Sequence, residues 1–401
     1  MNLSHKLQRR QWLALAASGV AVLASQPSAR AASTRQSTAT TRLAAAWESA
    51  AGYQVGVLEV GMPAPAAGAS ALSISAAIDL PNRAHGLLQE PDGTVLAVAR
   101  RPGDWLLRWR PDGTALAWSW VEPGRALNGH VLRSADGRTL YTTETNLENG
   151  AGLIGLRDAA TLEKTGEWPT AGMDPHELLL DAGGSLIVAN GGIPVRPETG
   201  RAKTQLPQMD PSLVRLDTRS GEVRGQWRLA DPRLSIRHIA WGTASAAGPR
   251  LLGIALQAEH DDPAVKAAAP VLAVFDGQKL QPWTTGTEAG VGQPLAGYGG
   301  DIAAFAGGFA VSCPRARGVA LWRTNGQWVG FLPLDGACAL ASDAETSKLK
   351  FEITGAKQTP ELPASLLVGG RLNALRRDPT GNAVTMALQG VRLDNHWIAL
   401  N

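Results

Sequence analysis

Five histidines stand at one position of a pattern that recurs along the chain, in which a polar residue precedes a short apolar strand. Imidazole is a common metal ligand, and its neutral form suits copper, zinc, iron and nickel. The residues at this position, in chain order, are His85, His130, His176, His238, Asp301, Cys338 and His396. The pattern therefore predicts a ring of polar residues, and its five histidines are candidate ligands for an iron, copper or zinc ion.

Further polar residues end the apolar run that follows in each repeat. If these strands return to the level of the histidines, their last residues lie at the same mouth of a central channel. Together with one acidic member of the ring, the side chains expected at that mouth are Arg100, Glu144, Asn190, Gln257 and Asp301.

The chain has two cysteines, Cys313 and Cys338. The repeat pattern places them near each other, and in an oxidising compartment two cysteines most simply form one disulfide. Metal ligation and buried free thiols are the alternatives.

Three interpretations of the ring stay open. Its side chains line a water-filled channel, or they bind a metal, or they form a catalytic mouth where a histidine and Glu144 act as general acid and base on a small substrate. No nucleophile elbow, zinc-protease helix, phosphate-binding loop or dinucleotide fingerprint occurs in a suitable context. The sequence therefore does not decide whether the protein is an enzyme, although it favours a protein without catalytic activity, and it identifies no catalytic residue.

The elements that must position these residues are short strands. Residues 83–120 hold four apolar runs joined by tight turns such as Pro91-Asp92-Gly93, which is the pattern and size of one propeller blade. Further copies begin near Asn128, His176, Ile236, Gly299 and Gly336. In the sixth copy we expect strands near Leu349–Ile353, Ser365–Val368 and Ala383–Leu388, and the insertions Ile193–Pro211 and Ala258–Ala269 are predicted to be loops.

A seventh copy begins at Leu393 and holds only one strand before the sequence ends. Residues 43–47, 53–60 and 72–80 supply three more apolar runs, so the C-terminal strand is expected to pair with N-terminal strands and close a ring. The sequence thus predicts an all-β, seven-bladed β-propeller in a single domain over residues 43–401. Six or eight blades, or a pair of β-sandwiches, are the alternatives.

The first 31 residues have the features of an export signal. The pair Arg9-Arg10 precedes an apolar run at 12–24, and Ala29-Arg30-Ala31 offers a cleavage site. We therefore expect a twin-arginine-type signal peptide over 1–31, a flexible segment over 32–42 and a periplasmic protein, with an ordinary secretory signal as the alternative. No later stretch is long and apolar enough to predict a membrane span.

The basic residues of the chain are concentrated in this signal. The whole chain has a formal net charge of +3, and subtracting the four basic residues of 1–31 leaves −1. A nearly neutral remainder gives no reason to expect nucleic acid as a partner.

Several segments resemble an uncharacterised family of exported proteobacterial proteins. They include Arg83-Ala84-His85-Gly86, Ala99-Arg100-Arg101-Pro102-Gly103 and Asp174-Pro175-His176-Glu177. Members of that family commonly have twin-arginine signals, are predicted to form propellers and are often encoded beside imelysin-like and di-haem peroxidase-like proteins in clusters associated with iron uptake. The resemblance implies a periplasmic role in iron or other metal handling, with metal-uptake proteins as partners.

The main hypothesis from the sequence is a periplasmic propeller that binds a transition metal, or a metal-bearing ligand, at its channel mouth. The first alternative is a protein-interaction scaffold whose binding surface is the blade loops, including the two insertions. The second is an enzyme that acts on a small metabolite at the same mouth.

Overall fold

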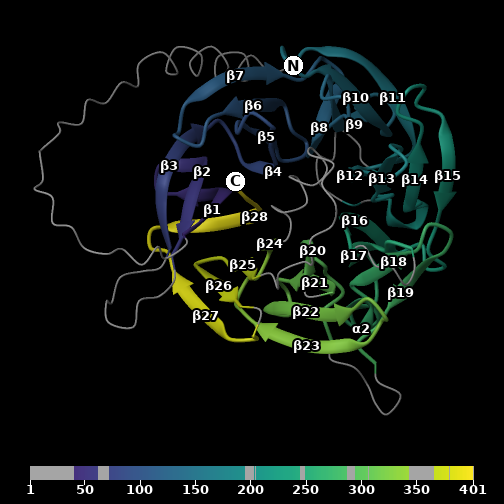
Figure 1. Ribbon diagram of the computed structural model, residues 1–401. Coiled ribbons are helices and arrows are strands. Elements are labelled where there is room, and N and C mark those ends of the chain that lie inside the picture. The colour runs from purple at the N-terminus through teal and green to yellow at the C-terminus, as the bar shows by residue number, and fades with distance from the viewer. Residues whose placement is uncertain are drawn as a thin grey trace, which may run out of the picture.

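The protein is a ring of seven four-stranded antiparallel sheets, or blades, as the computed structural model shows (Figure 1). The structure describes residues 40–61, 72–194, 203, 205–243, 249–286, 294–305, 307–342, 365–378 and 380–400. The predicted signal peptide and most of the segment expected to be flexible lie outside these residues. The seven-bladed propeller expected from the repeats is confirmed.

Three consecutive blades follow the first N-terminal strands of the chain. Their strands are β4 (Ala84–Gln89), β5 (Val95–Ala99), β6 (Trp105–Trp109) and β7 (Ala115–Trp120); β8 (Arg125–Arg133), β9 (Thr139–Asn146), β10 (Ala151–Asp158) and β11 (Lys164–Met173); and β12 (Pro175–Leu180), β13 (Leu186–Asn190), β14 (Ser212–Leu216) and β15 (Val223–Trp227).

Three more blades complete the middle of the chain. Their strands are β16 (Leu234–Trp241), β17 (Leu252–Ala258), β18 (Leu272–Phe275) and β19 (Leu280–Trp283); β20 (Ile302–Phe305), β21 (Gly308–Cys313), β22 (Gly318–Arg323) and β23 (Trp328–Pro333); and β24 (Ala339–Ser342), β25 (Leu366–Gly369), β26 (Asn373–Arg377) and β27 (Ala383–Ala387).

The seventh blade joins the two ends of the described chain. Its strand order is β28-β1-β2-β3, formed by β28 (Val391–Ala399), β1 (Thr41–Ser49), β2 (Gly52–Val60) and β3 (Leu72–Leu80). Strand β28 pairs antiparallel with β1, with Leu43 opposite Ala399. This pairing confirms the expected closure, and β1 begins two residues before the expected domain start.

The sixth blade differs from its expected register. Strand β26 (Asn373–Arg377) is the third strand and was not expected, whereas the strand expected at Leu349–Ile353 lies outside the described residues. The two insertions also contain short helices, η2 (Leu206–Gln208) and α2 (Pro263–Ala268). No helix among the described residues has the length and hydrophobicity needed to cross a membrane.

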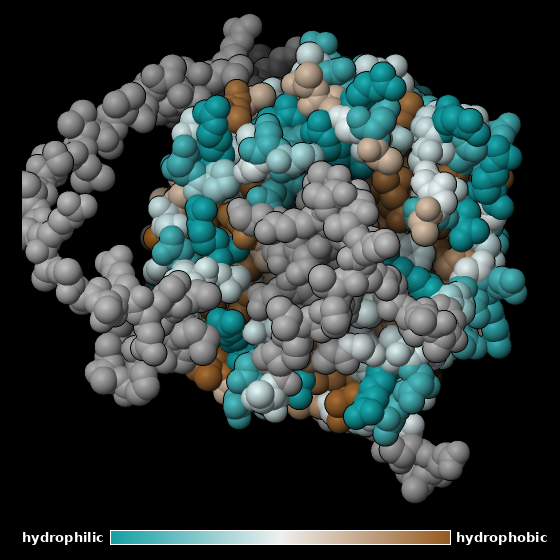
Figure 2. All heavy atoms as spheres, viewed as in Figure 1, coloured by the Kyte–Doolittle hydropathy of each residue, from teal (hydrophilic) through white to brown (hydrophobic). Residues whose placement is uncertain are grey.

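Apolar side chains fill the spaces between neighbouring blades. One cluster joins the first blade to the seventh and contains the fully buried Trp105 and Trp109 packed with Val55 and Val57. Burial of such side chains between sheets is the main favourable term in folding. Hydrophilic residues gather around the rim of the ring on the face that Figure 2 shows.

The innermost strands of the blades form a closed circle around the central channel. Strands β4, β8, β12, β16, β20, β24 and β28 each contact the next inner strand, and β28 also contacts β4 (Figure 1). Every histidine of the predicted ring is on one of these inner strands.

Candidate metal centre and channel pocket

The structure gathers all five predicted histidines into one cluster in the channel. We call His85, His130, His176, His238 and His396 the histidine cluster. The reported distances between their ring centroids run from 4.3 to 5.7 Å. Each residue is between 2% and 8% exposed, so the imidazoles contact one another with little access to solvent.

A repeated backbone irregularity turns these histidines toward the axis. In each of the five inner strands the pairing register shifts at the histidine, for example between Ala84 and Leu87 around His85, and between Ile236 and Ile239 around His238. A bulge interrupts the ladder and redirects a side chain. Because the same interruption occurs in five blades, five imidazoles point into one space instead of alternating between sheet faces.

Two carboxylates fix the orientation of three of the rings. Glu177 lies beside His238, with Nδ1 and Oε2 3.2 Å apart, and beside His130, with Nδ1 and Oε1 3.7 Å apart. Asp301 lies 3.3 Å from Nδ1 of His396. A carboxylate on Nδ1 keeps the proton there and leaves the Nε2 lone pair available, which is the usual outer arrangement around a metal-binding histidine.

His176 has a different role from the other four histidines. The guanidinium of Arg237, which can only donate, lies 3.1 Å from its Nδ1. In the neutral ring the proton must then be on Nε2, which lies 2.9 Å from Nε2 of His238. His176 is therefore a hydrogen-bond donor toward His238, and it orients the cluster instead of offering a lone pair to a metal.

The remaining four histidines offer nitrogen atoms that all lie within 4.8 Å of one another. These residues are His85, His130, His238 and His396. Ligands bound to one ion at about 2.0–2.1 Å are at most about 4.2 Å apart, so small side-chain rotations would suffice for coordination.

Several ring nitrogens in the cluster have no partner among the described residues. They are both nitrogens of His85 and Nε2 of His130 and of His396. A buried polar atom without a hydrogen bond costs about 1–3 kcal/mol. A bound cation would satisfy one nitrogen on each of these three rings at once, while the second nitrogen of His85 would keep its proton.

Burial sets the protonation of the cluster. It lowers the pKa of His85, His130, His176 and His238 well below the usual value, and neighbouring cationic groups lower it further. For His396 burial is the largest influence and acts in the same direction, but the charge and hydrogen bond of Asp301, with the charges of Glu177 and Asp394, together outweigh it and raise the pKa. Three of the four candidate ligands, His85, His130 and His238, are therefore neutral and in the form that binds a transition metal, and His396 would release its proton on binding.

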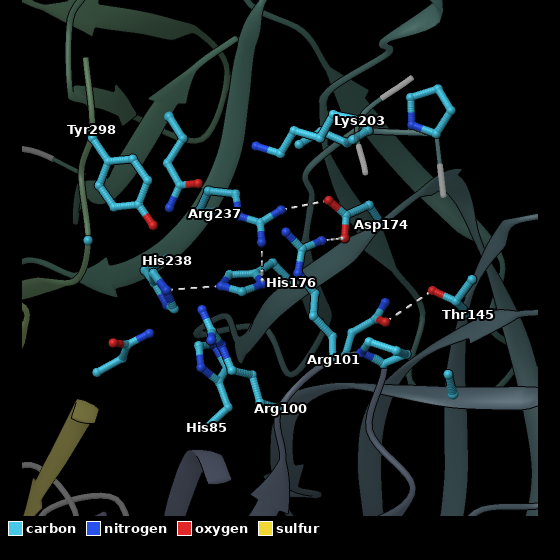
Figure 3. Close-up of a pocket in the computed structure, with 18 of the residues that line it drawn as sticks. His85, Arg100, Arg101, Thr145, Asp174, His176, Lys203, Arg237, His238 and Tyr298 are labelled. Atoms are coloured by element: carbon cyan, nitrogen blue, oxygen red, sulfur yellow. Dashed lines mark hydrogen bonds and ion pairs between the residues drawn. The ribbon is translucent and has the colours of Figure 1, made fainter. Parts of the chain in front are cut away.

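A pocket of about 200 Å³ lies against the cluster in the channel. Figure 3 shows Asp174 between Arg101 and Arg237, and His176 between Arg237 and His238. The described residues that line this channel pocket include Arg100 and Gln257, as expected from the sequence, together with Lys203, Tyr298 and Arg315. Asp301 is buried beside the cluster and accepts backbone hydrogen bonds from Ile302 and Leu340.

Glu144 and Asn190 do not lie at the channel mouth, which corrects the expectation. The Glu144 carboxylate is fully buried within its blade, where it pairs with Arg157 at 2.9 Å and with Lys164 at 2.8 Å. The Asn190 amide donates to the Thr170 carbonyl at 3.0 Å. Successive side chains of a strand point to opposite faces of the sheet. A residue at a strand end near the channel can therefore direct its side chain between the blades and away from the channel.

Replacement of Glu144 by glutamine is expected to reduce the free energy of unfolding by about 2 kcal/mol. Arg157 keeps its contact with Glu122 at 3.1 Å, so the loss is limited to the contacts of one charged acceptor. Chemical denaturation measures the change, and the exposed Glu148→Gln is the control, expected within about 0.5 kcal/mol of wild type. If the Glu144→Gln variant instead lost metal content without losing stability, Glu144 would act at the channel mouth, as the sequence predicted.

The two cysteines are free thiols, which contradicts the predicted disulfide. Cys313 is fully buried in the apolar cluster between the fourth and fifth blades. Cys338 instead lines the channel pocket, where its Sγ lies 3.4 Å from Oδ1 of Asn395. The two side chains therefore lie in different compartments of the fold, although Cys313 ends β21 and Cys338 directly precedes β24 of the adjacent blade.

The sequence did not single out the charged residues that organise the cluster. Asp174, Glu177 and Arg237 each stand within two residues of a cluster histidine. Their closeness to the histidines in the sequence is the feature that could have identified them, because the bulge that turns each histidine inward also brings its neighbours to the channel.

These features define the class of the protein: a seven-bladed propeller with a buried histidine cluster beside a charged channel pocket. Residues 78–400 match the family described as "Protein of unknown function (DUF1513)", and the chain belongs to that family. The membership confirms the predicted relation to an uncharacterised family. A comparison with curated proteins found no match.

Solved structures share the fold at low sequence identity. Virginiamycin B lyase from Staphylococcus aureus is 11% identical, with a TM-score of 0.51, over 76% of this chain and 84% of its own. Hydrazine synthase of Kuenenia stuttgartiensis is 11% identical, with a TM-score of 0.52, over 84% and 92%. A functionally unknown protein from Desulfotomaculum acetoxidans DSM 771 is 9% identical, with a TM-score of 0.51, over 89% and 100%. At these identities the likeness concerns the fold alone.

Proposed function

We propose that this propeller binds one transition metal ion through its histidine cluster and serves in metal handling. The observation that carries the proposal is the convergence on one space of four buried histidines, three of which have a ring nitrogen without a partner among the described residues. A water-filled channel would leave these imidazoles hydrated, whereas here they are almost fully buried.

The ligand chemistry selects a borderline metal. Four neutral imidazole nitrogens suit zinc, copper, iron or nickel and do not suit the hard cations magnesium and calcium, which prefer oxygen ligands. The residues that would hold the ion are His85, His130, His238 and His396, with Glu177 and Asp301 on the far nitrogens of three of the rings. The ion would then replace the contact between His176 and His238 as the partner of the His238 Nε2 atom.

A periplasmic location and a part in iron or other metal uptake belong to the same proposal. The location is supported by the sequence of residues 1–31, and the role is supported by the family resemblance. Periplasmic metal-uptake proteins are the partners that this role implies.

Metal content tests the proposal. The protein is purified without a histidine tag and measured by elemental mass spectrometry, as isolated and after reconstitution of metal-free protein with Zn²⁺, Cu²⁺ or Fe²⁺. About one ion per chain is expected for one of these metals. The variant His130→Ala/His238→Ala is expected to bind none, because it removes two of the four ligands.

His260→Ala is the matched control for that measurement. His260 lies outside the cluster and pairs with Asp231 at 3.0 Å, so its replacement should leave the metal content unchanged. Circular dichroism establishes that each variant is folded. Absence of metal from wild type after reconstitution with all three ions, or equal metal content in the folded double variant, would overturn the proposal.

A further inference from the structure

The channel pocket has many more cationic groups than anionic ones. Among the described residues that line it, the carboxylate is Asp174, and the cationic side chains are Arg100, Arg101, Lys203, Arg237 and Arg315, of which Lys203 pairs with the buried Glu259 beside the pocket. They come from four separate parts of the ring, so the positive charge surrounds the pocket instead of lying on one wall. A cavity lined by one sign of charge attracts a ligand of the other sign.

The deepest of these charges is incompletely neutralised. Asp174 is shared between Arg101 and Arg237, with one oxygen 2.6 Å from the Arg237 guanidinium, so one carboxylate serves two cations. Arg237 is 2% exposed, and its Nε has no partner among the described residues.

The pocket also has the size and the polar groups for a small organic molecule. Its volume of about 200 Å³ is far above the roughly 10–15 Å³ that one water requires. Amide side chains of Asn128, Gln257 and Asn395 line it beside the arginines. The planar guanidinium binds a carboxylate through two parallel hydrogen bonds, so several arginines around one cavity favour a ligand with several carboxylates.

We propose that the channel pocket binds a small organic anion that has two or more carboxylates. Arg100 and Arg315 hold it at the mouth, and Arg237 holds its deepest carboxylate beside His176 and His238. Only the orientation of that carboxylate toward a metal rests on the proposed function. Capture of the anion by the arginines does not depend on a metal.

The test uses citrate as the probe and the metal-free full chain. Isothermal titration calorimetry is expected to show citrate binding to wild type that weakens as salt is raised. The variant Arg100→Gln/Arg315→Gln should bind citrate at least tenfold more weakly, because each charge-assisted hydrogen bond contributes that much or more. Arg317→Gln, which removes a 73%-exposed arginine two residues along the chain, is the matched control and should bind citrate as wild type does.

Two further probes define the ligand class, and the outcomes separate this inference from the proposed function. Glycerol, which is uncharged, should not bind, and inorganic phosphate should bind more weakly than citrate. No citrate binding, equal binding by the folded double variant, or tighter binding of phosphate would each overturn the inference. If the protein binds citrate but takes up no metal, the anion pocket is supported and the metal proposal fails. If it takes up metal but does not bind citrate, the metal proposal is supported and the anion pocket fails.

Discussion

Metal-free protein is expected to lose about 3–4 kcal/mol of stability for each pH unit near pH 5.5. His85, His130, His176 and His238 have a lowered pKa in the folded state, so they stay neutral there while the unfolded chain takes up protons below about pH 6.5. The stability that these groups provide is present above that pH and is lost as the pH falls.

One acidic group opposes this trend and reduces its size. Burial raises the pKa of Glu177 to about 7, so between its ordinary value and pH 7 the folded protein holds a proton that the unfolded chain releases. Four protons taken up by the unfolded state and one held by the folded state leave a net difference of about three. His396, whose pKa is raised, is protonated in both states near pH 5.5 and adds little.

Urea denaturation of metal-free protein at pH 7.5, 6.5 and 5.5 measures this dependence. The free energy of unfolding should be nearly flat between the first two values and fall steeply between the last two. His85→Leu should reduce the slope by about one proton, or about 1.4 kcal/mol per pH unit. A slope near pH 5.5 that is no steeper than the slope above pH 6.5 would show that the cluster is hydrated and protonated in the folded state.

The fold was predictable because its signals are local. Alternating apolar runs and Asp-Gly turns specify each hairpin within about 45 residues, and the single strand left at the C-terminus had no partner except the N-terminal runs. Where the local signal weakens, as in the sixth blade, β26 was missed, and the strand expected at Leu349–Ile353 lies outside the described residues. The predicted register of the histidines followed from the same repeat.

The chemistry of the site was less predictable because it depends on contacts between blades. His176 has the same place in the repeat as His238, but Arg237 on the neighbouring strand makes it a donor. Glu144 and Asn190 were assigned to the mouth from their position at strand ends, and the direction of each side chain decided otherwise. A one-residue shift in a strand reverses the face that a side chain occupies, and no repeat pattern specifies that shift.

The substitution His85→Leu is expected to stabilise metal-free protein and to abolish its stabilisation by metal. Both ring nitrogens of His85 are buried without a partner among the described residues, so leucine removes a desolvation cost of about 1–3 kcal/mol at pH 7.5. Wild type should gain about 4 kcal/mol when free metal exceeds the dissociation constant a thousandfold. The variant should gain nothing at the same metal concentration, since it has lost one of four ligands.

The opposite signs of these two effects separate a metal site from a structural core. A histidine that packs only as part of the core would destabilise the protein when replaced, with or without metal. Chemical denaturation of wild type and of His85→Leu, each with a chelator and with the bound metal, gives four free energies of unfolding from which the two effects are read. If the variant is less stable than wild type in the chelator and keeps the metal-dependent gain, His85 is a packing residue, and the ion must be held by the other imidazoles. If the expected pattern holds, the unpartnered nitrogens are a cost that the metal-free fold carries and that metal binding offsets.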